Sequence, residues 1–186
     1  MAVDPKSIVT YHNLGNLYAK QGRHDEAIQW YLKALEINPK YARAYNDLGN
    51  VLVALGQFDK AAEHFRTAAA LDATATEPYF NLGNLMVRLD QLDNAIAYFQ
   101  RALAIDPNYV RAHNNLGRVL AARGKLDEAI GHFREAVRLE PGFAEAHESL
   151  ISALIEQEKT EEASRQFQLM RRLVKGQGAA TKDGAR

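Results

Sequence analysis

The sequence predicts an all-α fold, a solenoid of stacked antiparallel helix pairs. The first observation is a Leu-Gly pair that recurs every 34 residues, at 14–15, 48–49, 82–83 and 116–117. The second is a set of alanines and aromatics that recur at the same spacing. They are Ala27, Ala61, Ala95 and Ala129, then Tyr31, Phe65, Phe99 and Phe133, then Ala34, Ala68, Ala102 and Ala136. Such a period is typical of repeat arrays, in which each unit buries its apolar face against its neighbours.

The period divides the chain into five repeats. Counted from Ile8, four full repeats cover residues 8–41, 42–75, 76–109 and 110–143, after a lead-in of residues 1–7. Residues 144–175 form a divergent fifth repeat rich in charged residues, which we predict to be a C-terminal cap. Residues 176–186 have no apolar periodicity, so we expect a disordered tail.

Each repeat is predicted to contain two helices. In the second repeat, apolar residues at helical spacing run up to Leu55, and a second amphipathic stretch follows Gly56. Gly22, Gly56 and Gly124 suit the left-handed conformation that ends a helix, and Asp90 occupies the same place in the third repeat. An aspartate then precedes each second helix and is predicted to cap it. These aspartates are Asp25, Asp59, Asp93 and Asp127.

The third repeat begins differently from the others. Ala73 stands where the other full repeats have proline, and Pro78 lies within the next predicted helical turn. Proline is tolerated in the first turn of a helix, so Thr76 is interpreted as the N-cap and Glu77 as the first helical residue. We expect an altered junction and an intact helix.

The glycine of the Leu-Gly pair has a predicted packing role. Glycine inside a helix costs about 1 kcal/mol relative to alanine. Its recurrence, together with that of the alanines, indicates that the two helices of a repeat approach closely at this point. Catalysis is not indicated at these positions.

These motifs resemble the tetratricopeptide repeat (TPR) family, whose 34-residue pattern is W-x₂-L-G-x₂-Y…A-x₃-F…P. The resemblance covers four full repeats and part of a fifth, and NLGNLYAKQGRHDEAIQWYLKAL carries it most clearly. It implies a superhelix whose first helices line a concave groove. It also implies a protein or peptide partner in that groove.

Asparagines are concentrated on the side of the first helices that the apolar pattern leaves free. Asparagine is a poor helix former, so its repeated use on a solvated face indicates a role other than helix formation. A carboxamide can pair with both the N–H and the C=O of an extended peptide. Groove asparagines of this kind are similar to those in the repeat domain of O-linked N-acetylglucosamine transferase and in bacterial TPR proteins. The predicted groove residues are Asn13, Asn16, Asn46, Asp47, Asn50, Phe80, Asn81, Asn84, Arg111, Asn114, Asn115 and Arg118.

Several alternatives stay open for this face. The asparagines can instead bond within or between helices, and Phe80 can pack against a neighbouring helix rather than anchor a ligand. A carboxylate clamp of the co-chaperone type fits poorly, because Asn46 and Asn115 stand where cationic residues are needed. The fifth repeat brings negative charge through Glu145, Glu148 and Glu156.

The amino-acid composition argues against several classes of partner and chemistry. Lys+Arg and Asp+Glu both number 23, so the formal net charge is zero, which argues against nucleic acid or an anionic membrane as the partner. Cysteine is absent, which excludes disulfides and thiolate chemistry. The N-terminal residues do not follow a signal-peptide pattern, and no apolar run is long enough for a membrane helix. These observations predict a cytoplasmic protein.

Catalytic and metal sites are not expected. His113 and His147 occupy equivalent repeat positions, but neither has an evident third ligand beside it, so we expect no metal and no cofactor. No nucleophile–base set or phosphate-binding loop stands out. The sequence therefore predicts a non-catalytic protein-interaction scaffold. The alternatives are a regulatory or docking module of a larger enzyme, such as a glycosyltransferase, and a self-assembling protein that forms homo-oligomers through its uncapped N-terminal repeat.

Overall fold

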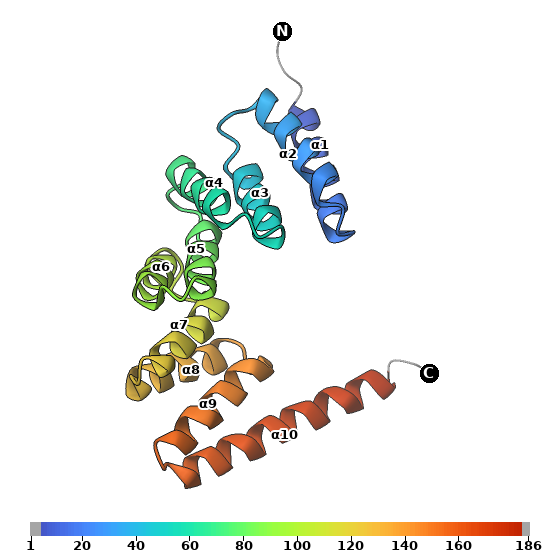
Figure 1. The fold of residues 1–186 in the computed structure, drawn as a ribbon. Helices are drawn as coiled ribbons and strands as arrows, with labels where there is room; N and C mark the ends of the chain where they lie inside the picture. The colour runs from blue at the N-terminus through green and yellow to red at the C-terminus, as the bar shows by residue number, and fades with distance from the viewer. Residues whose placement is uncertain (1–4, 184–186) are drawn as a thin grey trace. The chain divides into compact units, whose positions relative to one another are not determined.

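A computed structural model describes residues 5–183, and within this range the chain forms ten α-helices and no strand (Figure 1). The helices are α1 (Pro5–Lys20), α2 (His24–Ile37), α3 (Ala42–Ala54), α4 (Phe58–Leu71), α5 (Glu77–Arg88), α6 (Leu92–Ile105), α7 (Val110–Ala122), α8 (Leu126–Leu139), α9 (Ala144–Glu156) and α10 (Thr160–Asp183). The chain divides into two compact parts, an N-terminal part (Met1–Gln91) and a C-terminal part (Leu92–Arg186). Each part is described by itself.

Helices that are neighbours in sequence pack against each other in both parts. In the N-terminal part α1 packs on α2 and α3 on α4, and in the C-terminal part α7 packs on α8 and α9 on α10. The first helices of successive repeats also touch, α1 with α3, α3 with α5, and α7 with α9. The predicted all-α class of stacked helix pairs is therefore confirmed.

The repeated glycine makes room for the aromatic ring of the partner helix. A Cβ atom added at Gly15 would lie 2.4 Å from the Tyr31 ring, and one added at Gly49 would lie 2.6 Å from the Phe65 ring. Both rings are at most 1 % exposed. The close approach was predicted, but the glycine admits a large ring rather than a second small residue.

The fifth repeat breaks this arrangement. Ile151 occupies the glycine position, and Phe167 occupies the position of the buried ring. Phe167 is 45 % exposed, whereas its equivalent Phe133 is 2 % exposed. In the first, second and fourth repeats even a Cβ atom at this position would meet the buried ring, and Ile151 carries a larger, β-branched side chain. The cap role of residues 144–175 remains a prediction.

The first helices end as the sequence predicts. Gly22, Gly56 and Gly124 have φ angles of 73°, 74° and 74°, and Asp90 adopts the same left-handed conformation at 56°. Glu158 does so in the fifth repeat, with φ at 59°.

The predicted aspartate caps are wrong. The N-cap residues of α2, α4 and α8 are Arg23, Gln57 and Lys125, and none makes a side-chain cap hydrogen bond. Each helix begins one residue before its aspartate, so the carboxylate lies on the first turn. There it complements the positive end of the helix without capping it.

The junction before α5 agrees with the prediction. The helix begins at Glu77, Thr76 is its N-cap, and Pro78 lies in the first turn. The helix is intact through Arg88 because proline removes only an N–H that has no partner in the first turn.

The two ends of the chain differ from the sequence prediction. Helix α1 starts at Pro5, within the predicted lead-in, and residues 1–4 lie outside the described range. Helix α10 continues to Asp183, so residues 176–183 are helical where a disordered tail was predicted. Extending an existing helix costs little once it is nucleated, and Ala179 and Ala180 are good helix formers. Residues 184–186 of that tail are not described.

Candidate functional site

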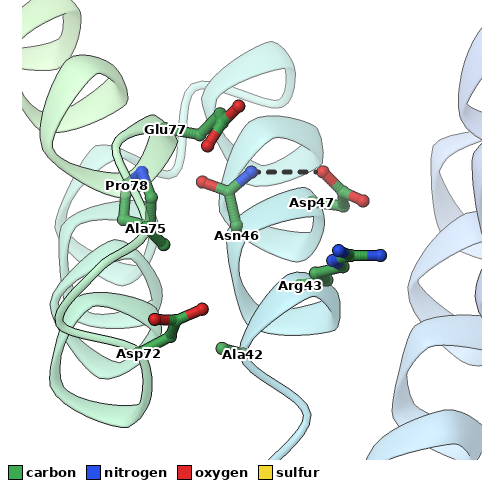
Figure 2. A pocket seen from close by; sticks show the side chains of 8 residues that line it. All are labelled: Ala42, Arg43, Asn46, Asp47, Asp72, Ala75, Glu77 and Pro78. Carbon is green, nitrogen blue, oxygen red and sulfur yellow. Dashed lines mark hydrogen bonds between the residues drawn. The ribbon is translucent and has the colours of Figure 1, made fainter. Parts of the chain in front are cut away.

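The N-terminal part has a pocket of about 420 Å³ on the side of the first helices that the sequence leaves free. Helix α3, the α4–α5 loop and the start of α5 surround it (Figure 2). This N-terminal pocket is lined by Ala42, Arg43, Asn46, Asp47, Asp72, Ala75, Glu77 and Pro78. Asn46 and Asp47 are thus the predicted groove residues that the structure brings to this pocket.

A hydrogen-bonded network crosses three first helices in the N-terminal part. His12 Nε2 on α1 lies 2.7 Å from Asp47 Oδ2 on α3. Asn46 Nδ2 donates to Asp47 Oδ1 at 3.2 Å, and Asn81 Nδ2 on α5 donates to Asn46 Oδ1 at 2.9 Å. Each bond between helices joins the fifth position of one repeat to the sixth position of the next. For Asn46, Asp47 and Asn81 the structure therefore supports the alternative in which these residues hold neighbouring repeats together.

The loop carboxylate of the N-terminal pocket is also engaged. The Thr74 hydroxyl donates to Asp72 Oδ1 at 2.7 Å and the Thr74 backbone N–H donates to the same oxygen at 3.0 Å. These hydrogen bonds, with a smaller contribution from Arg43, hold the pKa of Asp72 below its usual value. Asp72 therefore carries its charge at neutral pH as part of a local turn.

Asn16 is used within its own repeat. The Tyr31 hydroxyl donates to Asn16 Oδ1 at 2.7 Å. Burial, with a contribution from Asp47, raises the pKa of Tyr31, so the hydroxyl keeps its proton and remains a donor. The equivalent aromatic in the next repeat is Phe65, which has no hydroxyl to offer to Asn50.

Two predicted groove residues are buried and have to be removed from the set. Phe80 is 7 % exposed, so it packs inside the fold and does not present an anchor surface. Asn114 is fully buried at 0 % exposure, and its Nδ2 donates to Asn115 Oδ1 across a long 3.5 Å. Both residues occupy the fifth position of their repeats, the position that holds Asn46 in the second repeat.

The remaining predicted residues lie at or near the surface. Asn13 and Asn50 are exposed, and Asn84 and Asn115 are half-buried. Arg111 is exposed and its Nη2 donates to the Tyr109 hydroxyl at 2.8 Å.

The C-terminal part has its own pocket, of about 410 Å³, on the corresponding side of α7 and α9. This C-terminal pocket is lined by Arg118, Ala121, Phe133, Glu145, Glu148, Ser149, Ser152, Ala153 and Glu156. Arg118 Nη1 lies 2.8 Å from Glu145 Oε1, so its charge is partly neutralised by its neighbour. Sequence reasoning noted the three glutamates but left them out of the site, because the fifth repeat was interpreted as a cap. Their repeat positions, which match those of the free face, are the signal that identifies them.

The described residues 5–183 contain no group of three or more His, Cys, Asp or Glu side chains placed to hold a metal ion. In the same range, no helix is both long enough and apolar enough to cross a membrane.

Family models identify the class of protein. One model of the tetratricopeptide repeat matches residues 6–74, and a second matches residues 46–110, 80–142 and 114–176. The chain therefore belongs to the TPR family, whose fold is one that serves protein–protein interaction. No curated protein sequence matches the chain.

Solved structures agree with the family. MamA is 28 % identical with a TM-score of 0.78, over 89 % of this chain and 97 % of its own. YrrB, described as a TPR protein with an unusual peptide-binding site, is 29 % identical with a TM-score of 0.68, over 88 % of this chain and 84 % of its own. PilF of Pseudomonas aeruginosa is 24 % identical with a TM-score of 0.83, over 90 % and 76 %, and shows the fold alone.

Proposed function

We propose that the protein is a non-catalytic interaction scaffold that binds an extended peptide segment along its first helices. The observation that carries this proposal is the position of the two pockets. Each lies in a different part of the chain. Residues of the predicted free face of the first helices make up half of the lining of the N-terminal pocket and most of the lining of the C-terminal pocket. Family membership and the peptide-binding description of YrrB support the same function.

The contacts of the described residues reduce the number of predicted groove side chains that are candidates for holding the peptide. The side chains of Asn46, Asp47 and Asn81 bond to other first helices, and Phe80 is buried. Four other predicted asparagines are exposed or half-buried, and on this ground we take them as the candidates for pairing with peptide main chain. They are Asn13, Asn50, Asn84 and Asn115. Pairing with main chain gives affinity with little selection of peptide sequence.

Replacing these four asparagines by alanine tests the proposal. The partner is first captured with the full chain, and the affinity of its extended segments is then measured by calorimetry. Each lost hydrogen bond should cost about 0.5–1.5 kcal/mol, and the loss should be similar for unrelated segments because main chain is being read. Asn94→Ala, an exposed position on the second helix α6, is the matched control. Full affinity in the fourfold variant would contradict the asparagine mechanism.

A second candidate function is association between copies, and one observation favours it. Leu17 on α1 is 50 % exposed, whereas its repeat equivalents Val51 and Val119 are each 4 % exposed. Leu17→Glu should reduce any concentration-dependent increase in mass measured by light scattering, and an unchanged mass curve would count against this candidate.

A further inference from the structure

The fourth and twenty-third positions of the repeats pair across the two helices of one repeat. Tyr11 meets Trp30 with ring centroids 5.6 Å apart, and Tyr45 meets His64 at 5.8 Å. In α7 and α8 the same positions hold His113 and His132, with centroids 5.3 Å apart. The chain thus places two imidazoles where other repeats place at most one.

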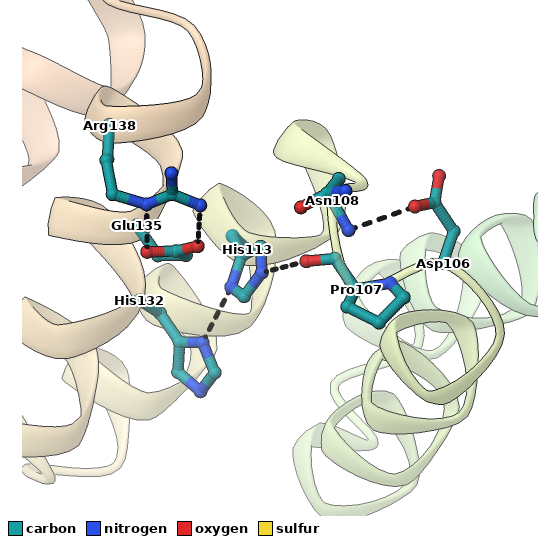
Figure 3. A network of polar contacts seen from close by, with 7 residues as sticks. All are labelled: Asp106, Pro107, Asn108, His113, His132, Glu135 and Arg138. Atoms are coloured by element: carbon teal, nitrogen blue, oxygen red, sulfur yellow. Dashed lines mark hydrogen bonds and ion pairs between the residues drawn. The ribbon is translucent and has the colours of Figure 1, made fainter.

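The hydrogen bonds of His113 determine which of its two ring nitrogens carries the hydrogen (Figure 3). Its Nε2 lies 3.0 Å from the Pro107 carbonyl oxygen, which can only accept, so Nε2 carries a hydrogen. Its Nδ1 lies 3.0 Å from His132 Nδ1. In neutral His113 this Nδ1 is an acceptor, so His132 Nδ1 must donate to it.

We propose that the His113–His132 pair is a proton-sensitive latch between α7 and α8, which holds at neutral pH and weakens below about pH 6. One extra proton is tolerated, because it adds to His132 Nε2 and leaves the donor at Nδ1 in place. A second proton would have to bind His113 Nδ1, where it meets the His132 N–H. Folded α7–α8 therefore binds at most one proton at this pair, and the unfolded chain binds two.

Two carboxylates of α8 act on the pair, Glu128 on His132 and Glu135 on His113, but neither removes the clash of two hydrogens between the two Nδ1 atoms. Burial and the neighbouring His113 lower the pKa of His132 below its usual value. Glu128, also on α8, raises this pKa, but by less. Glu135, also on α8, is paired with Arg138 at 2.6 Å. From the α6–α7 loop the pair faces the Pro107 carbonyl, beside Asp106, whose Oδ1 accepts from the Asn108 backbone N–H.

The fifth repeat provides a natural comparison. His147 Nε2 donates to the Pro141 carbonyl at 2.9 Å, as His113 does to Pro107. Its Nδ1, however, meets Gln166, the repeat equivalent of His132. An amide can turn either its NH₂ or its oxygen toward the ring, so it accommodates neutral and protonated imidazole alike. The α9–α10 pair should therefore be much less sensitive to pH.

The sign of the effect follows from proton uptake. Unfolded histidines titrate near pH 6.5, so well below that pH the unfolded chain holds at least one more proton than folded α7–α8. Stability contributed by the pair is complete above pH 6.5 and falls as the pH decreases. The unfolding equilibrium constant should rise by about tenfold per pH unit, or about 30-fold at pH 5.

His132→Gln, which copies the fifth repeat, and His113→Tyr, which copies the Tyr45–His64 pair, test the latch in the full chain. Hydrogen exchange of α7 and α8 is measured at pH 7.5 and pH 5 after correction for the intrinsic rates. Helices α5 and α6, which contain no histidine, are the internal reference. We expect wild-type protection of α7 and α8 to fall by up to about 30-fold relative to the reference, and both variants to lose most of this fall.

Imidazole NMR of the unmodified chain supplies a second readout if a variant fails to fold. At pH 5 the folded protein should show only one of the two rings protonated. The proposal would be overturned if the protection of α7 and α8 depended on pH equally in wild type and variants. It would also be overturned if both His113 and His132 were protonated in the folded protein at pH 5.

Discussion

The N-terminal and C-terminal pockets differ in how far their polar side chains are engaged by other residues of the chain. In the N-terminal pocket, Asn46 and Asp47 are bonded to the neighbouring first helices, and Asp72 is held by Thr74. In the C-terminal pocket, Glu148 and Glu156 are exposed and make no hydrogen bond or ion pair with another described residue. A polar residue on the free face of a TPR helix thus either joins repeats or stays available to a partner, and repeat position alone does not decide which.

The bonds between first helices also differ between the two parts, together with side-chain length at the sixth position. Asp47 and Asn81 reach back to the fifth-position residue of the preceding repeat. In the fifth repeat this position holds the shorter Ser149, and the amide of Asn114 bonds instead to Asn115 on its own helix. The cross-helix bond is therefore replaced by a local one.

The largest expected effect concerns a feature that both parts share. Gly49→Ala and Gly117→Ala each place a Cβ atom 2.6 Å from a buried ring, Phe65 or Phe133. Overpacking of this kind costs about 1–3 kcal/mol, and the ring cannot move away because it is enclosed. Urea unfolding should show similar losses for the two variants. A loss in one part and none in the other would mean that the two parts are not packed alike.

A smaller effect separates residues that join repeats from residues available to a partner. Asn81→Ala removes the donor to Asn46 and should lower the free energy of unfolding by about 1–2 kcal/mol, because a half-buried amide oxygen loses its partner. Asn50→Ala, at an exposed position, should change it by less than about 0.5 kcal/mol. Thermal unfolding of the two variants measures this difference. Equal stability would show that the network across α1, α3 and α5 contributes nothing.

The repeated pattern predicts the packing of the fold well because that packing is local. Leu-Gly and the following aromatic sit at fixed spacing on two adjacent helices, so their contact follows from the period. The groove is harder to predict, since Asn46 and Asn50 are the same residue type and differ only in what lies opposite them. Asn46 finds Asn81 on the next repeat, and this pairing depends on how successive repeats are rotated.

The α10 helix shows a further limit of the pattern. Gly176 and Gly178 and the lack of apolar periodicity indicated disorder, and periodicity reports packing rather than helix formation. A helix that is already nucleated extends at little cost, whether or not its sequence has an apolar period. Apolar spacing therefore predicts which helices are buried and does not predict where the last one ends.

The smallest expected effect concerns the ion pair at the edge of the C-terminal pocket. Arg118 and Glu145 are 60 % and 51 % exposed in their side chains, so water and salt screen their attraction. A double-mutant cycle with Arg118→Gln and Glu145→Gln should give a coupling of about 0.2–1 kcal/mol at low salt, and less at high salt.

Arg118→Gln should nevertheless change peptide binding, because among the described residues Arg118 is the one cationic side chain that lines the pocket beside Glu145, Glu148 and Glu156. Calorimetry at two salt concentrations should then show tighter binding of basic peptide segments and weaker binding of acidic ones. The N-terminal pocket offers the control, because Arg43→Gln should leave the C-terminal part unchanged. If Arg118→Gln alters all segments equally at both salt concentrations, then charge does not distinguish the two pockets and only the hydrogen-bonded network does.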